Sequence, residues 1–482
     1  MGYFEVTLPP QELIFNRFNF ASTNDPIGGF VIGDFNLDGK LDVAFEVQGR
    51  TSASLGILLG NGDGTFSKPK ITKIPYGSGT ILTADFNQDG IPDLVLADGI
   101  FNRIYVLLGK GDGTFRTLAP AQMDQSPNLM AVGDFNGDGK IDLATSNTND
   151  NSVSILLGSG DGSFQSSIDI LGLPTPFEIA VGDFNKDGKL DIGVTEYGSA
   201  ITILTGNGDG TFAIGNTYAT ANPALSIAAA DVNGDGKLDL VVVNGANSQA
   251  GDPEGDWEVF LGNGDGTFQS GIDYSPGGGF LEAVVADVNG DGKPDVVATG
   301  GPYGSYAGTL AMFLGNGDGT FQQPISRIVG QAPSSLMAGD LNGDGRLDLI
   351  FEDIGSPSSL SGLIQVPATL TPKGLSFGKV ALGSSSVSET VTLTNVGGPA
   401  LGLSSVTVGG SNPGDFAPAD NCPTNLASGA SCDISVTFKP TALGPRSAGI
   451  SVSFSGGAIP QGFTVKGTGT SAVQIAAAGG KP

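Results

Sequence analysis

The sequence predicts an all-β protein, a seven-bladed β-propeller followed by a C-terminal immunoglobulin-like β-sandwich. Three observations support this prediction. An acidic nine-residue motif occurs seven times between residues 34 and 348, a glycine-rich turn recurs between its copies, and about 100 residues of alternating apolar and polar sequence follow the last copy. Repeats of this length built from four short strands are typical of propeller blades, and regularly spaced short strands are typical of sandwiches.

One copy of the acidic motif spans residues 134–142 and reads DFNGDGKID. In a loop, the side-chain oxygens at positions one, three and five can converge on one ion, and the carbonyl of position seven and a bidentate Asp at position nine would complete a calcium site. Gly139, at position six, supplies the positive φ that such a loop needs. Strand-like residues follow the ninth position, so we predict a strand-loop-strand hairpin and not an EF-hand.

All seven copies keep Asp, Asn, Asp, Gly and Asp at positions one, three, five, six and nine, which predicts about seven Ca²⁺ ions, one per blade. The predicted ligands, with the backbone carbonyl of position seven included, are Asp34, Asn36, Asp38, Lys40 and Asp42; Asp85, Asn87, Asp89, Ile91 and Asp93; Asp134, Asn136, Asp138, Lys140 and Asp142; Asp183, Asn185, Asp187, Lys189 and Asp191; Asp231, Asn233, Asp235, Lys237 and Asp239; Asp287, Asn289, Asp291, Lys293 and Asp295; and Asp340, Asn342, Asp344, Arg346 and Asp348. The alternative is an acidic Asx-turn without metal, which would crowd three carboxylates in each loop.

The charge balance agrees with metal loops. The chain has 49 acidic and 22 basic residues, a net charge of −27, of which seven divalent cations would offset about half. The remaining acidity argues against nucleic acid and anionic membranes as partners. The chain has no histidine, which excludes imidazole acid-base catalysis and histidine-bound zinc. Cys422 and Cys432 suit one disulfide in an oxidising compartment; two buried free thiols are the alternative.

The second repeated feature is a tight turn, seen in residues 58–66, LLGNGDGTF. A Leu-rich run, Asn-Gly-Asp-Gly and an aromatic residue predict a hairpin, and we interpret the Asp of this turn as a turn former, not a ligand. One unit therefore contains strands near 129–133, 141–146, 153–158 and 164–170.

The spacing of the two motifs predicts how the array ends. The phenylalanine of each turn lies 19 residues before the next acidic loop, and Phe15 lies 19 residues before Asp34. The last unit lacks a fourth strand, so we predict that a strand at about residues 11–22 completes blade seven. An open solenoid is the alternative.

Length variation among the units falls between the acidic loop and the third strand, on the face opposite the acidic hairpins. Blades five and six carry the longest insertions there, at residues 244–258 and 300–306. Exposed aromatic and Arg side chains favour recognition, and the alternative for each is packing at a blade end. The candidate ligand contacts are Trp257, Tyr303, Tyr306, Tyr274, Tyr197 and Arg103.

We predict a propeller at residues 1–366, a linker at 367–374, a sandwich at 375–470 and a flexible tail at 471–482. The first residues lack the basic start and apolar run of a signal peptide, so we expect a trimmed or mature form of an exported protein. No apolar run long enough to insert into a membrane is visible.

The sequence resembles two families. Residues 107–115 and 133–140 resemble the FG-GAP (VCBS-type) repeat of integrin α-subunit propellers and bacterial secreted proteins, and the resemblance covers residues 1–366. It implies calcium hairpins on one face and ligand binding through loops of the other. The C-terminal part resembles the ASPM/SPD-2/Hydin-type (choice-of-anchor D) immunoglobulin-like domain through residues 375–378, 392–395, Cys422, Cys432 and 436–440.

These observations lead us to expect a secreted or cell-surface, calcium-binding adhesion protein that is monomeric and not an enzyme. Its propeller loops would bind a glycan or an extracellular protein, and the sandwich would be a spacer or attachment domain. Two alternatives remain. One is a polysaccharide lyase or related enzyme on the same propeller, which would need a base beside an Arg. The other is a purely structural spacer without a ligand.

Overall fold

The computed structural model describes residues 15–23, 25–49, 53–74, 80–245, 256–274, 279–301, 308–354, 357–366, 368–396, 400–455 and 461–471. Nearly all of the regular structure in these ranges is β-strand, and the helical elements are the short 3₁₀ turns η1 (Thr148–Asp150) and η2 (Pro413–Asp415). No helix in the described ranges is long and apolar enough to cross a membrane. The chain divides into two compact units, one with most of residues 17–364 and the other with most of residues 365–482.

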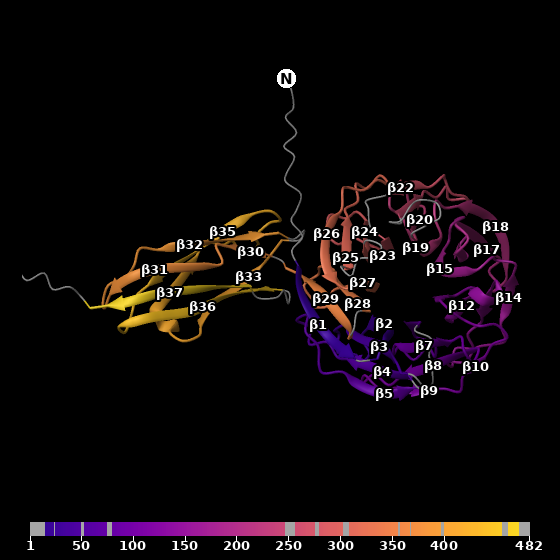
Figure 1. The fold of residues 1–482 in the computed structure, drawn as a ribbon, viewed down its shortest axis with the longest axis horizontal. Helices are drawn as coiled ribbons and strands as arrows, with labels where there is room; N and C mark the ends of the chain where they lie inside the picture. Colours follow the sequence, from indigo (N-terminus) through magenta and orange to yellow (C-terminus); the bar gives the residue numbers. More distant parts are fainter. Residues whose placement is uncertain are drawn as a thin grey trace, which may run out of the picture. The chain divides into compact units, whose positions relative to one another are not determined.

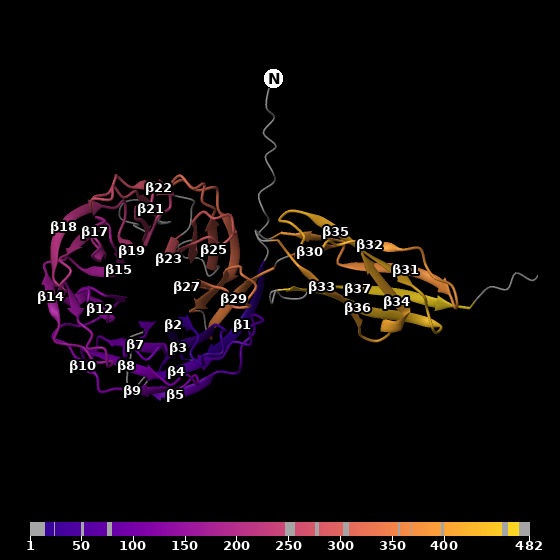
Figure 2. The same cartoon turned by 180° about the vertical axis from the view of Figure 1, so that it is seen from behind.

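The first unit contains seven antiparallel sheets arranged in a ring (Figures 1 and 2). The strands of the first four sheets, from the inside of the ring outward, are β2 (Ile27–Gly33), β3 (Asp42–Gln48), β4 (Ala53–Leu58) and β5 (Lys70–Ile74); β6 (Ile81–Ala84), β7 (Asp93–Asp98) and β8 (Arg103–Gly109), with β9 (Phe115–Thr117) and β10 (Ala121–Gln122) both paired to β8; β11 (Met130–Gly133), β12 (Asp142–Asn147), β13 (Ser152–Leu156) and β14 (Ile168–Leu171); and β15 (Pro176–Gly182), β16 (Asp191–Glu196), β17 (Ala200–Gly206) and β18 (Phe212–Ala219).

The strands of the last three sheets, in the same direction, are β19 (Ala224–Ala230), β20 (Asp239–Asn244), β21 (Asp256–Phe260) and β22 (Ile272–Tyr274); β23 (Gly279–Ala286), β24 (Asp295–Gly301), β25 (Gly308–Phe313) and β26 (Ile325–Gly330); and β27 (Pro333–Gly339), β28 (Asp348–Asp353), β29 (Ser358–Gln365) and β1 (Phe15–Thr23). The N-terminal strand β1 is thus the outermost strand of the seventh sheet, as the 19-residue spacing predicts. The innermost strand β2 of the first sheet packs against both β6 and β27, so the first and seventh sheets are neighbours.

The apolar core of the propeller lies between neighbouring sheets. One cluster joins Leu55 and Ile57 of the first sheet to Leu94 and Leu96 of the second, and similar clusters follow around the ring. In four of these interfaces the Phe at position two of an acidic loop packs edge-to-face on the turn Phe of the next blade. These pairs are Phe35 with Phe115, Phe86 with Phe164, Phe135 with Phe212, and Phe184 with Phe268, with centroids 5.5–5.8 Å apart.

Backbone hydrogen bonds join the two sequence motifs across the same interfaces. In five of the tight turns, the second glycine of Asn-Gly-Asp-Gly or its equivalent donates its N–H to the carbonyl at position two of the preceding blade's acidic loop. The pairs are Gly113 to Phe35 (2.9 Å), Gly162 to Phe86 (3.0 Å), Gly210 to Phe135 (3.1 Å), Gly266 to Phe184 (3.1 Å) and Gly319 to Val232 (3.3 Å). At these five interfaces, the turn of one blade therefore docks on the acidic loop of its neighbour.

The second unit is a two-sheet sandwich. One sheet has the order β30 (Ala368–Thr371), β32 (Glu389–Asn395), β35 (Ser431–Phe438) and β34 (Phe416–Asp420); the other has the order β31 (Gly374–Ala381), β37 (Gln461–Thr470), β36 (Gly444–Phe454) and β33 (Leu403–Gly409). Alternate residues of β35, β36 and β37 are buried, as expected for strands with one face on the core. A disulfide joins Cys422 to Cys432, as the cysteine count predicts.

The prediction of a linker at residues 367–374 is wrong. β30 lies within these residues and pairs antiparallel with β32, and its Ala368 and Leu370 are completely buried. Pro372 and Gly374 suggested a linker, but they mark the turn between the first two strands of the sandwich. The tail predicted at 471–482 lies outside the described residues, apart from Ser471.

Candidate functional site

The acidic loops fold around their own backbone amides. In the first loop, the N–H of Asp38 donates to the side-chain oxygens of both Asp34 and Asn36, at 3.0 Å each. The N–H of Gly39 donates to the second oxygen of Asp34 at 2.8 Å, and that of Lys40 donates to Asp38 at 3.1 Å. The loops that begin at Asp85, Asp134, Asp183, Asp231 and Asp287 repeat this pattern. Side chains of positions one and three therefore meet at a single amide.

The Asp at position nine is built into the sheet. In the third blade, one oxygen of Asp142 accepts the N–H of Phe135 at 2.8 Å, and the other accepts the N–H of Gly158 at 2.7 Å. The same pair of bonds occurs at Asp42, Asp93, Asp191, Asp239 and Asp295. This residue ties the loop's start to the end of the third strand, a role that sequence reasoning missed.

Burial and crowding act together on this carboxylate. Asp142 is inaccessible to solvent, and burial raises its pKa, with further raising by the charges of Asp138 and Asp134. Burial likewise raises the pKa of Asp93 and of Asp295 to about 6. The amide hydrogen bonds, two to Asp93 and three to Asp295, lower the pKa but do not cancel this effect. A nearby cation would stabilise the charged form of these carboxylates.

In two loops, the lysine at position seven supplies positive charge to the carboxylates. The ammonium groups of Lys140 and Lys237 lie 3.0 Å from the position-five carboxylates of Asp138 and Asp235. The hydrogen bond from Lys140 lowers the pKa of Asp138. The position-five carboxylates of these loops therefore attract positive charge.

The loops carry the oxygen ligands that a hard cation prefers, but these ligands do not form a preassembled coordination site. Their donors are all oxygens, and those of positions one and three already converge. Among the described residues, no three His, Cys, Asp or Glu side chains form a preassembled metal-binding group. The ninth carboxylate already accepts two amides, so a bound ion would have to use its remaining lone pairs.

The Asp of the tight turn has a different role. The Oδ1 atom of Asp63 accepts both the N–H and the hydroxyl of Thr65, at 3.0 and 2.5 Å. The equivalent aspartates at 112, 161, 209, 265 and 318 bond in the same way to the Thr or Ser two residues later. This geometry agrees with the turn-former interpretation.

On the opposite face, polar residues at the end of the second strand anchor the loops in five of the blades. Asp98 accepts the N–H groups of Ile100 and Phe101, and Asn147 donates to Ser152 and Ser154. Glu196 of the fourth blade, Asn244 of the fifth and Asp353 of the seventh make similar hydrogen bonds. Loops held by buried hydrogen bonds can present side chains in fixed positions.

Several large apolar side chains on this face are exposed to solvent. Ile100 and Phe101 are 63% and 53% exposed, Tyr197 is 55% exposed, and Ile354 is 53% exposed. Tyr197 contacts Phe177 at the start of β15, with ring centroids 6.1 Å apart. The sequence analysis selected Tyr197 but missed Ile100 and Phe101 of the second blade. The sequence pattern that could have indicated them is an apolar pair between two turn-forming residues, Gly99 and Asn102.

The structure corrects two of the candidate ligand contacts. Trp257 is fully buried and stacks on Tyr274 at 4.3 Å, between Phe313 and Phe321. Tyr274 is half-buried, and its hydroxyl donates to the carbonyl of Gly319. Both belong to the interface between blades five and six, so the interpretation as exposed recognition residues is wrong.

The other candidates differ in outcome. Arg103 is half-buried, contacts the Phe101 ring at 5.7 Å and donates to Gln122 at 3.4 Å, which places it beside the exposed apolar pair. Tyr303 and Tyr306 lie outside the described residues, as do residues 246–255 of the blade-five insertion.

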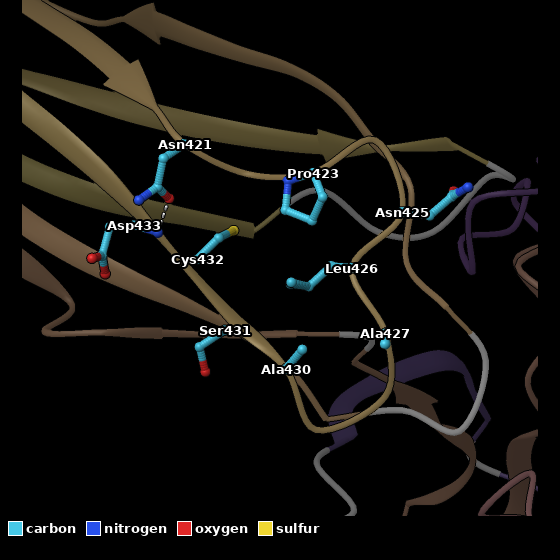
Figure 3. A pocket seen from close by; sticks show the side chains of 9 residues that line it. All are labelled: Asn421, Pro423, Asn425, Leu426, Ala427, Ala430, Ser431, Cys432 and Asp433. Carbon is cyan, nitrogen blue, oxygen red and sulfur yellow. Dashed lines mark hydrogen bonds between the residues drawn. The ribbon is translucent and has the colours of Figure 1, made fainter.

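The sandwich has a shallow pocket of about 500 Å³ beside its disulfide (Figure 3). Pro423, Leu426 and Cys432 lie around its centre, and the N–H of Asp433 donates to Asn421 at 2.8 Å at one end. Its lining is mostly small side chains, with Asp433 as the charged group.

The fold and the loops define a class of protein, a repeat-built β-propeller with an acidic hairpin in each blade. The chain belongs to the FG-GAP-like repeat family: that family's model matches residues 34–96, 85–145, 134–194, 194–242, 249–298 and 287–351. Residues 369–468 match the HYDIN/CFA65/VesB-like, Ig-like domain. FG-GAP repeats suggest a ligand-binding propeller protein of the extracellular type.

Solved structures similar to the two parts include a protein from Lactobacillus plantarum, at 14% identity and a TM-score of 0.49, over 65% of this chain and 88% of that one. Another is an ASH/PapD-like domain of human CEP192, at 18% identity and a TM-score of 0.18, over 22% of this chain and 87% of that one. A search of curated proteins finds no match.

Proposed function

We propose that this protein is a secreted or cell-surface adhesion protein that binds a glycan or another extracellular protein through the propeller face opposite the acidic hairpins. The observation that carries the proposal is the set of exposed apolar side chains on anchored loops of that face, Ile100, Phe101, Tyr197 and Ile354. Exposed apolar groups near a positive side chain such as Arg103 are a common feature of recognition surfaces.

Calcium is the second part of the proposal. Seven loops with oxygen donors at the same positions would each hold one Ca²⁺, and the ion would relieve the crowding of their carboxylates. The turn of the next blade docks on five of these loops, so an ordered loop would also stiffen the interface between blades. The sandwich would then hold the propeller away from its attachment point.

Ligand binding can be tested with a glycan array and a pull-down from extracellular proteins, in 1 mM calcium and in chelator. The variant Ile100→Ser/Phe101→Ser should weaken binding of the captured ligand by about ten-fold or more, because it removes the adjacent pair of exposed apolar side chains beside Arg103. The matched control is Ile71→Ser/Ile328→Ser, which changes two side chains that are 50% and 77% exposed on the outer strands β5 and β26.

The proposal fails if both double variants bind equally well, or if no ligand is found in either condition. The second result would favour the spacer alternative. Incubation with uronic-acid polysaccharides, followed by detection of unsaturated products, tests the lyase alternative separately.

A further inference from the structure

The seven innermost strands surround a cavity of about 450 Å³, and none of its lining residues belongs to an acidic loop. Every innermost strand contributes to its wall, which is largely apolar, with Phe30, Leu82, Met130, Leu225 and Leu336 among its lining residues. A second cavity of about 340 Å³ shares Leu82, Leu336 and Met337 and extends toward the acidic loops. The volume suits a small organic molecule.

Two carboxylates face this apolar cavity. Glu178 of β15 and Glu282 of β23 each lie five residues before the first Asp of their blade's acidic loop, so they occupy equivalent positions two blades apart. Each reaches the following blade. Glu178 accepts the N–H of Ile227 and Glu282 accepts the N–H of Leu336, both at 3.3 Å. These bonds fix the two side chains and leave lone pairs on each carboxylate for a ligand.

The cavity supplies no positive charge to balance them. None of its lining residues is Lys or Arg, the chain has no His, and none of the ion pairs within the described residues includes Glu178 or Glu282. The titratable groups that face it are Glu178 and Glu282, with Glu352 of β28 close enough to act on Glu282. Partly buried like charges without a counter-ion favour binding of a cation.

The pKa values agree with this geometry. Burial raises the pKa of Glu178 to about 7. Burial, and next the charge of Glu178, raise the pKa of Glu282 to about 8. Burial also raises the pKa of Glu352 to about 7, against hydrogen bonds from Ser334 and Ser358 that lower it. Ionisation of Glu178 and Glu282 is therefore unfavourable unless a positive group binds in the cavity.

We propose that this axial cavity binds a small alkyldiammonium ion, with one ammonium group on Glu178, the other on Glu282, and the hydrocarbon chain against the apolar wall. A metal ion fits less well, because Ca²⁺ requires six or more oxygen ligands and most of this wall is hydrocarbon. An ammonium group donates only three hydrogen bonds and carries methylenes that the wall can bury. The cavity is reached from the face opposite the acidic loops, where Leu281 is 45% exposed.

This inference goes beyond the proposed function, because it requires neither calcium nor the exposed loops. The test is calorimetric titration of the full chain at pH 8 and 1 mM calcium with 1,5-diaminopentane, 1-aminopentane and 1,5-pentanediol. We expect the diamine to bind most tightly, the monoamine more weakly and the diol not at all. No binding of the diamine at millimolar concentration, or equal binding of the diol, would overturn the proposal.

The decisive variant is Glu178→Gln/Glu282→Gln, in which the amide oxygens can still accept the N–H groups of Ile227 and Leu336. It should weaken diamine binding by more than ten-fold. The matched control, Asp25→Asn/Asp273→Asn, makes the same change in net charge at exposed positions away from the cavity and should leave the affinity within two-fold. Equal affinity of both variants would contradict the assignment, as would displacement of the diamine by added calcium.

A measurement on the unmodified chain covers the case in which the double variant does not fold. The carboxylates must be ionised to hold ammonium groups, and their pKa values of about 7 and 8 mean that they are largely protonated at pH 6. Diamine affinity should therefore fall at least ten-fold from pH 8 to pH 6. Titration at pH 7.5 in buffers of different ionisation enthalpy should show proton release, and its absence would refute the proposal.

Discussion

The ninth-position aspartate shows how one side chain can have two uses. Asp142 is completely buried, and each of its oxygens accepts a backbone N–H, from the loop and from the end of the third strand. Burial raises its pKa, so the folded chain holds this carboxylate at a cost in the absence of a cation. The same residue is also the last predicted calcium ligand, which couples the state of the loop to the strands of its own blade.

We predict that Asp142→Ala is far more destabilising than Asp138→Ala in chelator. The first change leaves two buried amides without acceptors and should lower the free energy of unfolding by about 2–4 kcal/mol. The second removes a solvent-exposed side chain at position five and should cost less than about 1 kcal/mol. Urea unfolding measures both. Equal costs would mean that the ties to Phe135 and Gly158 contribute little.

Trp257 gives a second test at this scale, because it is the chain's single tryptophan and is fully buried. Trp257→Ala should lower the free energy of unfolding by about 3–5 kcal/mol, because it loses the stacking on Tyr274 and the contact with Phe313. Trp257→Phe keeps an apolar ring in the same place and should cost less than about 1.5 kcal/mol. Thermal unfolding measures the difference, and blue-shifted emission of the unmodified protein reports the burial. A stable Trp257→Ala protein that loses its ligand would restore the recognition role.

At the scale of elements, a close approach of two backbones requires glycine at the end of the third strand of a blade. A Cβ on Gly158 would overlap the carbonyl oxygen of Ile141, and the equivalent glycines at 60, 109, 206, 262 and 315 meet the same carbonyl of their own blades. At position four of the acidic loop, by contrast, a Cβ on Gly137 meets nothing within 4 Å. Leu37, Gln88 and Lys186 occupy that position in other blades with φ of 58–60°.

Gly158→Ala should therefore lower the free energy of unfolding by about 3 kcal/mol, because a backbone must move to accept the new methyl group. Gly137→Ala is the matched control and should cost no more than about 1 kcal/mol, the usual strain of a left-handed residue. Denaturant unfolding in chelator compares them without a contribution from calcium. Similar costs for the two variants would contradict the argument from backbone contact.

At the scale of the whole molecule, we predict that calcium dominates the stability of the propeller. A site with Kd of ~10⁻⁴ M gains roughly 1.4 kcal/mol in 1 mM calcium, and seven such sites gain on the order of 10 kcal/mol. Adding a chelator should lower the melting temperature by more than 10 °C, and excess calcium should restore it. The fluorescence of Trp257 follows the melting of the propeller. Identical melts with and without chelator would refute calcium binding by the loops.

The sequence by itself determined the architecture, because its signals are local and repeated. The acidic loop, the tight turn and the 19-residue step between them follow from backbone geometry within a few residues, and they place seven sheets and the N-terminal strand without reference to distant contacts. The turn-forming role of Asp63 follows for the same reason, since its partner Thr65 is two residues away.

Only the tertiary structure decided which side chains are buried and what they face. An aromatic residue beside an insertion suggests recognition, yet Trp257 lies between two sheets because its strand alternation turns it toward Phe313. Likewise, Ala368 and Leu370 form a strand only because the β32 edge is available to them. Glu178 and Glu282 are more than 100 residues apart, and nothing local indicates that a ring of seven strands brings both to one cavity. Burial and charge proximity are properties of the assembled ring, so they follow from packing and not from the repeat.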